Sequence, residues 1–474
     1  MILEQLFEKA TGMPAVVSDE ITGSGSARRY YRLTAADGTS AIGTLGTDLE
    51  ENRAFIYLAR HFRDAGMPVP EVTAVSDDGM AYLQTDLGDT SLYDMLRRDA
   101  TSPVTEGLLR ETVGRLPDIQ FRGARGLDFS RCYPVAAMDH RSVMWDLNYF
   151  KYMFLKLSDV DFDEARLEDD LQEFARLVMS MAGSDTFMYR DFQSRNVMIC
   201  NGSPWFIDFQ GGRRGPVLYD LASFLWQARA GFSDSLRREL AGVYLESARR
   251  YRTMGSDREF AFNLYVMALF RTMQVLGAYG CRGVAQQKVR FIESIPRAVD
   301  NLRRLVEYLP SDRFPELSKA LRKLGDIPAY AVRPPREGLT VDVCSFGYRK
   351  SGIPRDFTGN GGGFVFDCRA ITNPGRYAEF IPLTGLDAPV ADFLERDGEV
   401  TEFLGHAKAV VGASVRRYID RGFSNLKVSF GCTGGRHRSV YCAQHMAEWI
   451  NATFGVRVEL NHVERGLSRT FEAR

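Results

Sequence analysis

The sequence contains no uninterrupted apolar run approaching the ~18 residues that a membrane-spanning helix requires. Its seven cysteines are scattered and show no paired CxxC spacing, which favours reduced thiols and argues against disulfides or a zinc site. Met1–Lys9 predicts an acidic amphipathic helix rather than a signal peptide. A cytoplasmic protein with no membrane partner is therefore expected.

A dominant charge of one sign is also lacking. The 60 Lys and Arg residues nearly balance the 61 Asp and Glu residues, and the net charge of −1 gives no general attraction to nucleic acid or to an anionic membrane. Internal repeats and low-complexity segments are absent. At 474 residues, the chain is long enough to hold more than one domain.

Lysine is absent between Lys9 and Lys151, and the first part of this region alternates strand and turn signals around one helix. The predicted strands are Tyr30–Leu33, Ala41–Thr44 and Ala81–Gly88, and the predicted helix is Glu50–Ala65. The pattern then becomes mostly helical. We therefore expect a β-rich lobe over about residues 1–88, a hinge, and a helical lobe over about residues 89–330.

A charged, proline-containing linker, residues 331–338, follows the helical lobe. Beyond it, strand and helix signals alternate. Strands are predicted at Leu339–Cys344, Gly363–Cys368 and Leu426–Phe430, and helices at Glu399–Asp420 and Ser439–Phe454. This alternation predicts a small α/β domain over residues 339–474.

The densest chemical signal is the run Tyr189–Asn196, followed by Asp208. The residues between them predict two short strands joined by a tight turn at Asn201-Gly202, a hairpin that brings Asn196 and Asp208 to the same open end. An amide oxygen beside a carboxylate suits Mg²⁺ that also binds phosphate oxygens and water. Asp191 is then free to accept the proton of an attacking hydroxyl, as phosphoryl transfer requires.

Two charged residues near this run have more than one interpretation. Asp220 is expected to be structural, either capping a helix start or holding the catalytic loop. Arg190 is expected to orient Asp191, with an ordinary surface cation as the alternative.

The stretch YRDFQSRNVMI…WFIDFQGGRRGPVLYDLASFLW resembles the aminoglycoside phosphotransferase/choline kinase superfamily, whose fold is that of protein kinases. It is most similar to the cell-wall sugar kinases that phosphorylate the anomeric hydroxyl of N-acetylmuramate and N-acetylglucosamine. The resemblance covers about residues 1–325 and implies a two-lobed α+β domain that uses ATP and Mg²⁺ to phosphorylate an amino sugar.

This resemblance also implies roles for individual residues. Asp191 is the catalytic base, accompanied by Arg190, and Asn196 and Asp208 are the metal ligands. The implied nucleotide contacts are Gly23, Ser24, Gly25 and Ser26 over the phosphates, and Gln84 and Asp86 at the adenine hinge.

The chain departs from the family pattern in two places. Tyr189 stands where a histidine is common, at a position that buttresses the loop. No third-strand lysine can pair with the α- and β-phosphates, although the anomeric sugar kinases share this lack. Either Arg28, Arg29 or Arg32 supplies the charge, with Arg28 counted among the predicted nucleotide-binding residues, or backbone amides and metal do so alone. The alternative that the protein binds nucleotide without catalysing transfer stays open.

Gly431–Ser439 follows a predicted strand and opens a predicted helix. Its glycines let successive N–H groups turn inward, and its basic side chains add charge-assisted donors, so the segment predicts a phosphate-binding cradle. The alternative is a glycine-rich turn with incidental basic residues. The spacing of Cys432 and Arg438 also matches cysteine-dependent phosphatases, with Asp387 as the candidate acid, although Gly431 replaces their usual histidine.

Five motifs occur in the order found in the C-terminal domain of the RapZ RNase adapters, which binds glucosamine-6-phosphate and regulatory RNA. They are SFGY at Ser345–Tyr348, FDCR at Phe366–Arg369, NP at Asn373–Pro374, PLTG at Pro382–Gly385 and GCTGGRHRS at Gly431–Ser439. The resemblance spans about residues 338–465. It implies a phosphosugar site, with Arg369 and Thr384 as further contributors, at Cys432, Thr433, Gly434, Gly435, Arg436, His437, Arg438 and Ser439.

RNA binding is less well supported, because residues 338–474 hold 17 Lys and Arg against 15 Asp and Glu. An ordinary solvated surface is favoured over a basic stripe made by Arg416, Arg417, Arg421, Arg465, Arg469 and Arg474.

Together these features predict an ATP- and Mg²⁺-dependent small-molecule kinase for a hydroxyl of an amino sugar, joined to a phosphosugar-sensing domain. The alternative is a kinase-like regulatory adapter without turnover, which binds nucleotide on one side and phosphosugar or RNA on the other. The identity of the acceptor, the coupling between the domains and the oligomeric state, a homo-oligomer included, stay open.

Overall fold

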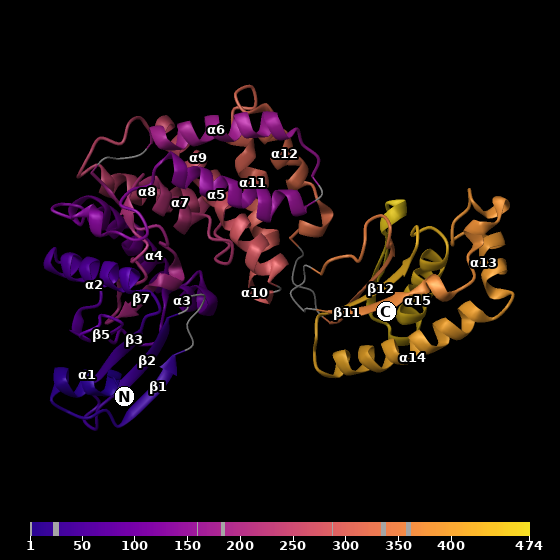
Figure 1. Ribbon diagram of the computed structural model, residues 1–474, viewed down its shortest axis with the longest axis horizontal. Coiled ribbons are helices and arrows are strands. Elements are labelled where there is room, and N and C mark those ends of the chain that lie inside the picture. The colour runs from indigo at the N-terminus through magenta and orange to yellow at the C-terminus, as the bar shows by residue number, and fades with distance from the viewer. Residues whose placement is uncertain are drawn as a thin grey trace. The chain divides into compact units, whose positions relative to one another are not determined.

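The computed structural model describes residues 2–21, 28–158, 160–181, 185–286, 288–332, 338–356 and 362–474. The chain divides into two compact units (Figure 1). The first comprises Met1–Cys281 and Ser294–Ala331, and the second comprises Arg282–Glu293 and Val332–Arg474. The predicted phosphate loop, Gly23–Ser26, and most of the predicted linker lie outside the described residues.

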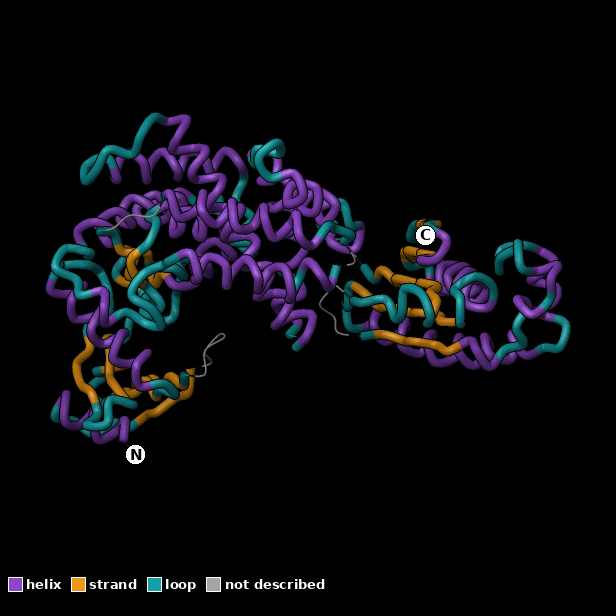
Figure 2. The backbone as a smooth tube through the Cα atoms, turned by 45° about the horizontal axis from the view of Figure 1, so that its top comes forward, coloured by secondary structure: helices purple, strands orange, loops and turns teal. Residues whose placement is uncertain are grey.

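The N-terminal lobe of the first unit is an antiparallel sheet with strand order β1-β2-β3-β5-β4 (Figures 1 and 2). Its elements are α1 (Ile2–Thr11), β1 (Val17–Ile21), β2 (Arg29–Thr34), β3 (Ser40–Leu45), α2 (Leu49–Asp64), β4 (Val72–Val75) and β5 (Ala81–Thr85). The sheet has one face on α1, since a Cβ added at Gly43 of β3 would lie 3.0 Å from the Leu3 side chain. Thr44 points to the opposite face, where its partner Tyr82 stacks on Phe55 of α2 with ring centroids 5.1 Å apart.

The second lobe of this unit is mainly helical (Figure 2). Its helices are α3 (Leu92–Asp99), α4 (Pro103–Pro117), α5 (His140–Met153), α6 (Glu164–Ser180), α7 (Leu218–Leu225), α8 (Asp234–Ala248), α9 (Asp257–Tyr279), α11 (Ile295–Leu305) and α12 (Pro315–Gly325). Among the described residues, Asp257–Ala285 is the one helical stretch long and apolar enough to cross a membrane by length and composition. Because 67% of its most apolar window is buried inside the fold, α9 is best described as a core helix.

This lobe also contains four short strands: β6 (Phe187–Met188), β7 (Val197–Cys200), β8 (Ser203–Phe206) and β9 (Arg213–Arg214). The predicted hairpin is confirmed, because β7 and β8 pair antiparallel with Cys200 opposite Ser203. Asn201 and Gly202 have φ values of 51° and 75°, which a two-residue turn matching the strand twist requires.

The second unit contains both helices and strands, drawn purple and orange in Figure 2. Its sheet has the strand order β11-β12-β10-β13-β14. Its pairs are parallel except for β13 with β14. The strands are β10 (Thr340–Gly347), β11 (Gly363–Asp367), β12 (Asn425–Cys432), β13 (Arg457–His462) and β14 (Leu467–Phe471), and the helices are α10 (Val289–Ile292), α13 (Ala388–Glu395), α14 (Glu399–Asp420) and α15 (Arg438–Phe454). β10 and β12 are buried almost throughout, as expected for parallel strands covered on both faces.

Phe62 of α2 supports the junction of the two lobes in the first unit. It has no exposed surface, and its ring meets those of Phe187 and Phe209 edge-on at centroid distances of 5.0 and 5.5 Å. We expect Phe62→Ala to lower the free energy of unfolding of this unit by about 3–5 kcal/mol, measured by chemical denaturation. Val104→Ala, at a 62% exposed position, should change the free energy of unfolding by less than about 0.5 kcal/mol. Equal changes in the two variants would contradict the supporting role of Phe62.

Candidate functional site

The loop that carries Asp191 is held by one buried carboxylate. Asp220 of α7 accepts the backbone N–H of Tyr189 at 2.9 Å and of Arg190 at 2.8 Å, and the Gln120 amide donates to it at 2.7 Å. Burial raises the pKa of Asp220 to about 7 against the effect of these hydrogen bonds. Arg190 has a φ of 78°, a region that side-chain-bearing residues rarely adopt, so the loop needs this anchor.

Asn196 and Asp208 lie together at the open end of the hairpin. The Asn196 amide donates to Asp208 at 2.9 Å and to the Asp191 carbonyl at 2.8 Å, and the Gln210 amide donates to the other Asp208 oxygen at 2.8 Å. Burial, and then the neighbouring Asp191 charge, raise the pKa of Asp208 to about 6. Such a carboxylate is a suitable ligand for a divalent cation.

The donor set is small and consists of oxygen ligands. Among the described residues, no group of three or more His, Cys, Asp and Glu side chains is arranged to hold a metal. One amide oxygen from Asn196 and one carboxylate from Asp208 therefore fit a Mg²⁺ ion that receives its other ligands from nucleotide phosphates and water.

Asp191 is oriented by a residue that the sequence did not reveal. Arg271 of α9 donates from Nη2 to Asp191 Oδ1 at 3.2 Å and from Nε to Ser223. Arg190, expected to take this role, instead lies 3.7 Å from Asp146. In the sequence Arg271 stands out as the one charged residue between Glu259 and Arg282, but nothing nearby links it to Asp191.

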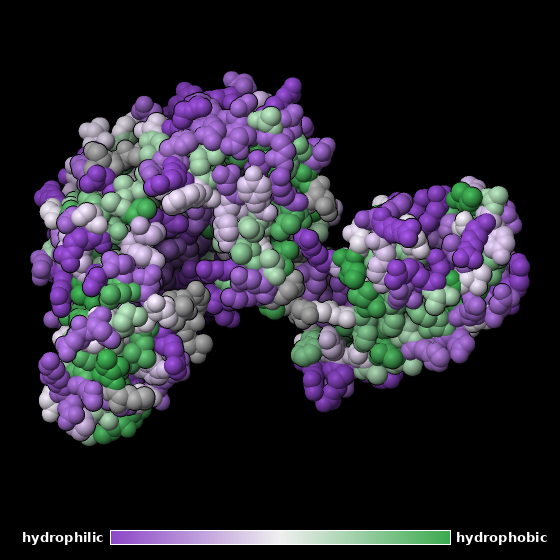
Figure 3. All heavy atoms as spheres, in the orientation of Figure 1, coloured by the Kyte–Doolittle hydropathy of each residue, from purple (hydrophilic) through white to green (hydrophobic). Residues whose placement is uncertain are grey.

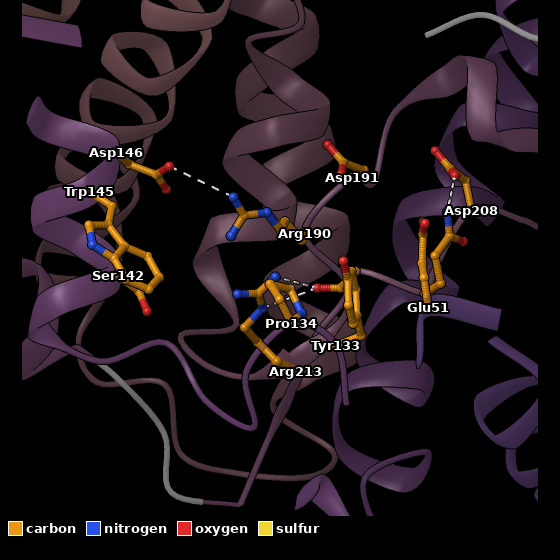
Figure 4. Close-up of a pocket in the computed structure, with 12 residues that line it drawn as sticks. Glu51, Tyr133, Pro134, Ser142, Trp145, Asp146, Arg190, Asp191, Asp208 and Arg213 are labelled. Atoms are coloured by element: carbon orange, nitrogen blue, oxygen red, sulfur yellow. Dashed lines mark hydrogen bonds and ion pairs between the residues drawn. The ribbon is translucent and has the colours of Figure 1, made fainter. Parts of the chain in front are cut away.

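A cavity of about 260 Å³ opens beside these groups (Figure 4). Residues of both lobes line it: Glu51, Tyr133, Pro134, Ser142, Trp145, Asp146, Arg190, Asp191, Asp208, Gln210, Gly211 and Arg213. Asp146 Oδ2 and Gln210 Oε1 are buried and have no hydrogen-bond partner among the described residues. The cavity thus presents unpaired acceptors, together with the indole of Trp145, which is 53% exposed. Figure 3 shows hydrophilic residues around the hollow of the first unit.

The nucleotide-site predictions fall on different parts of the N-terminal lobe. Asp86 at the hinge pairs with Arg32 at 2.7 Å, and Gln84 keeps a buried amide oxygen without a partner among the described residues. Arg29 pairs with Glu20 at the exposed margin of the sheet, and Arg28 is buried beside Glu51.

In the second unit, the predicted cradle joins β12 to α15. A Cβ at Gly435, where φ is 66°, would lie 2.8 Å from the Gly347 nitrogen, so the loop requires glycine there. Cys432 Sγ lies 3.2 Å from the Ser439 hydroxyl. Burial raises the pKa of this thiol, but the Ser439 hydroxyl and the backbone amides of Ser439, Arg436 and Gly435 outweigh burial, so the pKa lies below its ordinary value.

The basic side chains of this loop contact protein carbonyls. Arg438 Nη1 donates to the carbonyls of Arg369 and Ile371, while Arg436 donates to those of Pro382 and Leu383, and the ring of His437 contacts Phe380 O at 2.9 Å. These contacts brace the loop, and the backbone amides near Cys432 and Arg438 Nε, which is buried without a hydrogen-bond partner among the described residues, stay available as anion donors.

Three further predicted residues also have protein partners. Arg369 pairs with Asp367, and the Thr384 hydroxyl donates to Asp387 at 2.8 Å. This hydrogen bond, with the Thr384 amide, lowers the pKa of Asp387. Asp387 is therefore ionised near neutral pH and is poorly suited to act as a phosphatase acid.

Two family models match the chain. The model described as the phosphotransferase enzyme family matches residues 19–259, and that of the RapZ C-terminal domain matches residues 339–466. The first match covers half of the chain, and the protein belongs to the phosphotransferase enzyme family. It combines this phosphotransferase domain with a RapZ C-terminal domain.

Curated relatives share only part of their length with this chain. A nucleotide-binding protein of Paramagnetospirillum magneticum is 40% identical over 127 residues, which are 27% of this chain and 39% of that protein. A nucleotide-binding protein of Fervidobacterium nodosum is 38% identical over 129 residues, 27% of this chain and 44% of that protein. The chain thus spans about two fifths of these relatives.

Solved structures show weaker likeness. A choline kinase from Cryptosporidium parvum Iowa II is 12% identical, with a TM-score of 0.44 over 64% of this chain and 93% of its own. The amicoumacin kinase hAmiN, in complex with AMP-PNP, Ca²⁺ and Ami, is 11% identical, with a TM-score of 0.44 over 70% and 95%. Scores this low support no inference about the substrate.

The anchoring role of Asp220 can be tested by Asp220→Asn. One of its two acceptor oxygens becomes an N–H donor facing a backbone N–H, and we expect the free energy of unfolding of the first unit to fall by about 1–3 kcal/mol in urea denaturation. Asp64→Asn, at the exposed end of α2, should leave it within about 0.5 kcal/mol. Equal stability of the two variants would show that Asp220 does not hold the loop.

Proposed function

We propose that the first unit is an ATP- and Mg²⁺-dependent kinase that phosphorylates a hydroxyl of an amino sugar. The observation that carries this proposal is the placement of Asp191. Its carboxylate is oriented by Arg271, opens on the 260 Å³ cavity, and shares that cavity with Asp208. This combination of base, metal ligand and acceptor space is what phosphoryl transfer to an alcohol needs.

Each residue then has a defined task. Asp191 accepts the proton of the acceptor hydroxyl as that oxygen bonds to the γ-phosphorus, and Arg271 keeps the carboxylate turned toward the hydroxyl. Asn196 and Asp208 would hold Mg²⁺, which supplies charge neutralisation for the transferring phosphoryl group when bound. Asp220 fixes the backbone from which Asp191 projects.

The lining of the cavity supports a sugar acceptor. Trp145 offers an exposed aromatic face for the apolar side of a pyranose ring, and the adjacent Asp146 offers an unpaired acceptor for hydroxyl or amide N–H groups. Gln210 adds a second unpaired acceptor near Asp208. A polar, hydroxyl-rich ring matches these groups better than an apolar ligand.

The kinase assignment predicts Mg²⁺-dependent release of ADP with one or more amino sugars in a panel that also contains choline and aminoglycosides. Asp191→Asn should lower kcat by about 10²–10⁴-fold, because it removes the base, while Asp326→Asn, an exposed carboxylate on the same unit, should not. ATP binding without turnover on the whole panel would favour the regulatory adapter instead.

The pH dependence of Mg²⁺ binding should follow the ionisation of Asp208. Its raised pKa of about 6 means that the ionised, metal-binding form is lost as pH falls through about 6. We expect the apparent Mg²⁺ affinity, measured with ATP by calorimetry, to weaken over that range. An apparent Mg²⁺ affinity that stays constant between pH 7 and pH 5 would contradict the raised pKa of Asp208.

We also propose that the loop Cys432–Ser439 binds a phosphosugar. The turned-in amides and the N-terminus of α15 favour a phosphate group, and the lowered pKa of the Cys432 thiol reflects the same donors. Binding of a kinase product or a related sugar phosphate here would let the second unit sense the output of the first.

Ser439→Ala tests this site, because it removes a buried hydroxyl beside Cys432. Calorimetry with glucosamine-6-phosphate should show affinity reduced about tenfold, as expected for a hydrogen bond to a charged group. Ser468→Ala on β14 is the exposed control, and glucosamine is the ligand without phosphate. Equal affinities for glucosamine-6-phosphate and glucosamine would show that the site does not recognise the phosphate group.

A further inference from the structure

The N-terminal lobe lacks the lysine that usually contacts the nucleotide phosphates from the third strand of a kinase. On β3, the residues on the face away from α1 are Ser40, Ile42 and Thr44, and none carries charge. Thr44 is fully buried against Tyr30 and Tyr82 of the neighbouring strands. β3 therefore offers the phosphates no protein cation.

Three arginines lie near this position, and two of them are engaged away from it. Arg29 is 59% exposed at its side chain and pairs with Glu20 of the edge strand. Arg32 pairs with both Asp86 and Asp89 at the hinge, at 2.7 Å each. Both guanidinium groups are therefore held at other parts of the lobe, the exposed sheet margin and the hinge.

Arg28 has a different environment. It directly precedes β2, its side chain is 2% exposed, and Nη2 lies 3.4 Å from Glu51 of α2. Its guanidinium also lies 5.9 Å from the Phe55 ring centroid, on the α2 side of the sheet. A cation on this face, paired with a carboxylate of the first long helix, is the same pairing of charges as the lysine–glutamate pair of kinases, with the cation supplied from beside β2.

Arg28 lies close to the metal end of the cleft, since its Nη2 is 3.4 Å from Glu51. Its partner Glu51 lines the same cavity as Asp208 (Figure 4). Nucleotide phosphates bridged to Asp208 by a metal would therefore come within reach of this guanidinium.

We propose that Arg28, positioned by Glu51, replaces the missing lysine and binds the phosphates of the nucleotide. A planar guanidinium can contact two phosphate oxygens at once, which compensates for its origin beside β2 instead of on β3. This role rests on the proposed kinase function and adds the residue that would secure the phosphates in the absence of a lysine.

Nucleotide binding by the full chain tests the proposal without turnover. With Mg²⁺ present, calorimetry should show ATP affinity reduced about tenfold or more in Arg28→Gln, because a charge-assisted contact is lost, while adenosine affinity changes less than about twofold. Arg28→Lys should retain part of the ATP affinity, since the cation remains. Arg29→Gln is the adjacent control and should bind both ligands as the wild type does.

Two results would overturn the proposal. ATP bound equally well by Arg28→Gln and wild type would show that Arg28 does not contact the phosphates. Equal losses of ATP and adenosine would show that Arg28 supports the lobe and not the ligand. The kinase assignment is tested separately. If ATP binding depends on Arg28 but no phosphoryl transfer is ever detected, the kinase assignment is wrong and the proposed contact between Arg28 and the phosphates still holds.

Discussion

The first unit depends on the two hydrogen bonds that Asp220 accepts from the backbone of Tyr189 and Arg190. These hydrogen bonds hold Arg190 at a φ of 78° and thereby set the direction in which the Asp191 side chain projects from the backbone. Asn196 then donates to the Asp191 carbonyl and to Asp208, so the metal ligands take their positions from the same loop. Burying the Asp220 carboxylate costs folding free energy, as its pKa of about 7 shows. Three hydrogen-bond donors converge on it and offset this cost.

The charges around the cavity extend this constraint. Asp191 faces Arg271, Asp146 faces Arg190, and Glu51 faces Arg28, so each of these three carboxylates beside the cavity has a cationic neighbour. Asp208 differs, since its hydrogen bonds among the described residues come from two neutral amides, and the charges of Arg195 and Arg28 do not outweigh the burial that raises its pKa. A carboxylate in this environment suits the divalent cation that the proposed chemistry would use.

Much of this could be predicted from sequence because it is local. The Asn201-Gly202 turn fixed the hairpin register, and α14 occupies the predicted residues Glu399–Asp420. β1 was missed because all five of its residues are exposed and show no apolar alternation. Arg271 was missed because it reaches Asp191 from 80 residues away, and no local pattern encodes that contact. The basic side chains after Cys432 contact carbonyls of distant segments, which no local pattern encodes, and their role as phosphate ligands stays a prediction.

The two candidate phosphate sites therefore differ in their construction. In the second unit, the side chains of Arg436 and Arg438 brace the loop, and the backbone amides near Cys432 offer the contacts. A backbone cradle is rigid and suits recognition of a stable phosphate monoester. In the first unit, side chains from both lobes offer the contacts, and each is set by a partner on another element. Groups arranged in this way can change their spacing as a phosphoryl group moves, which fits transfer at the first site and sensing at the second.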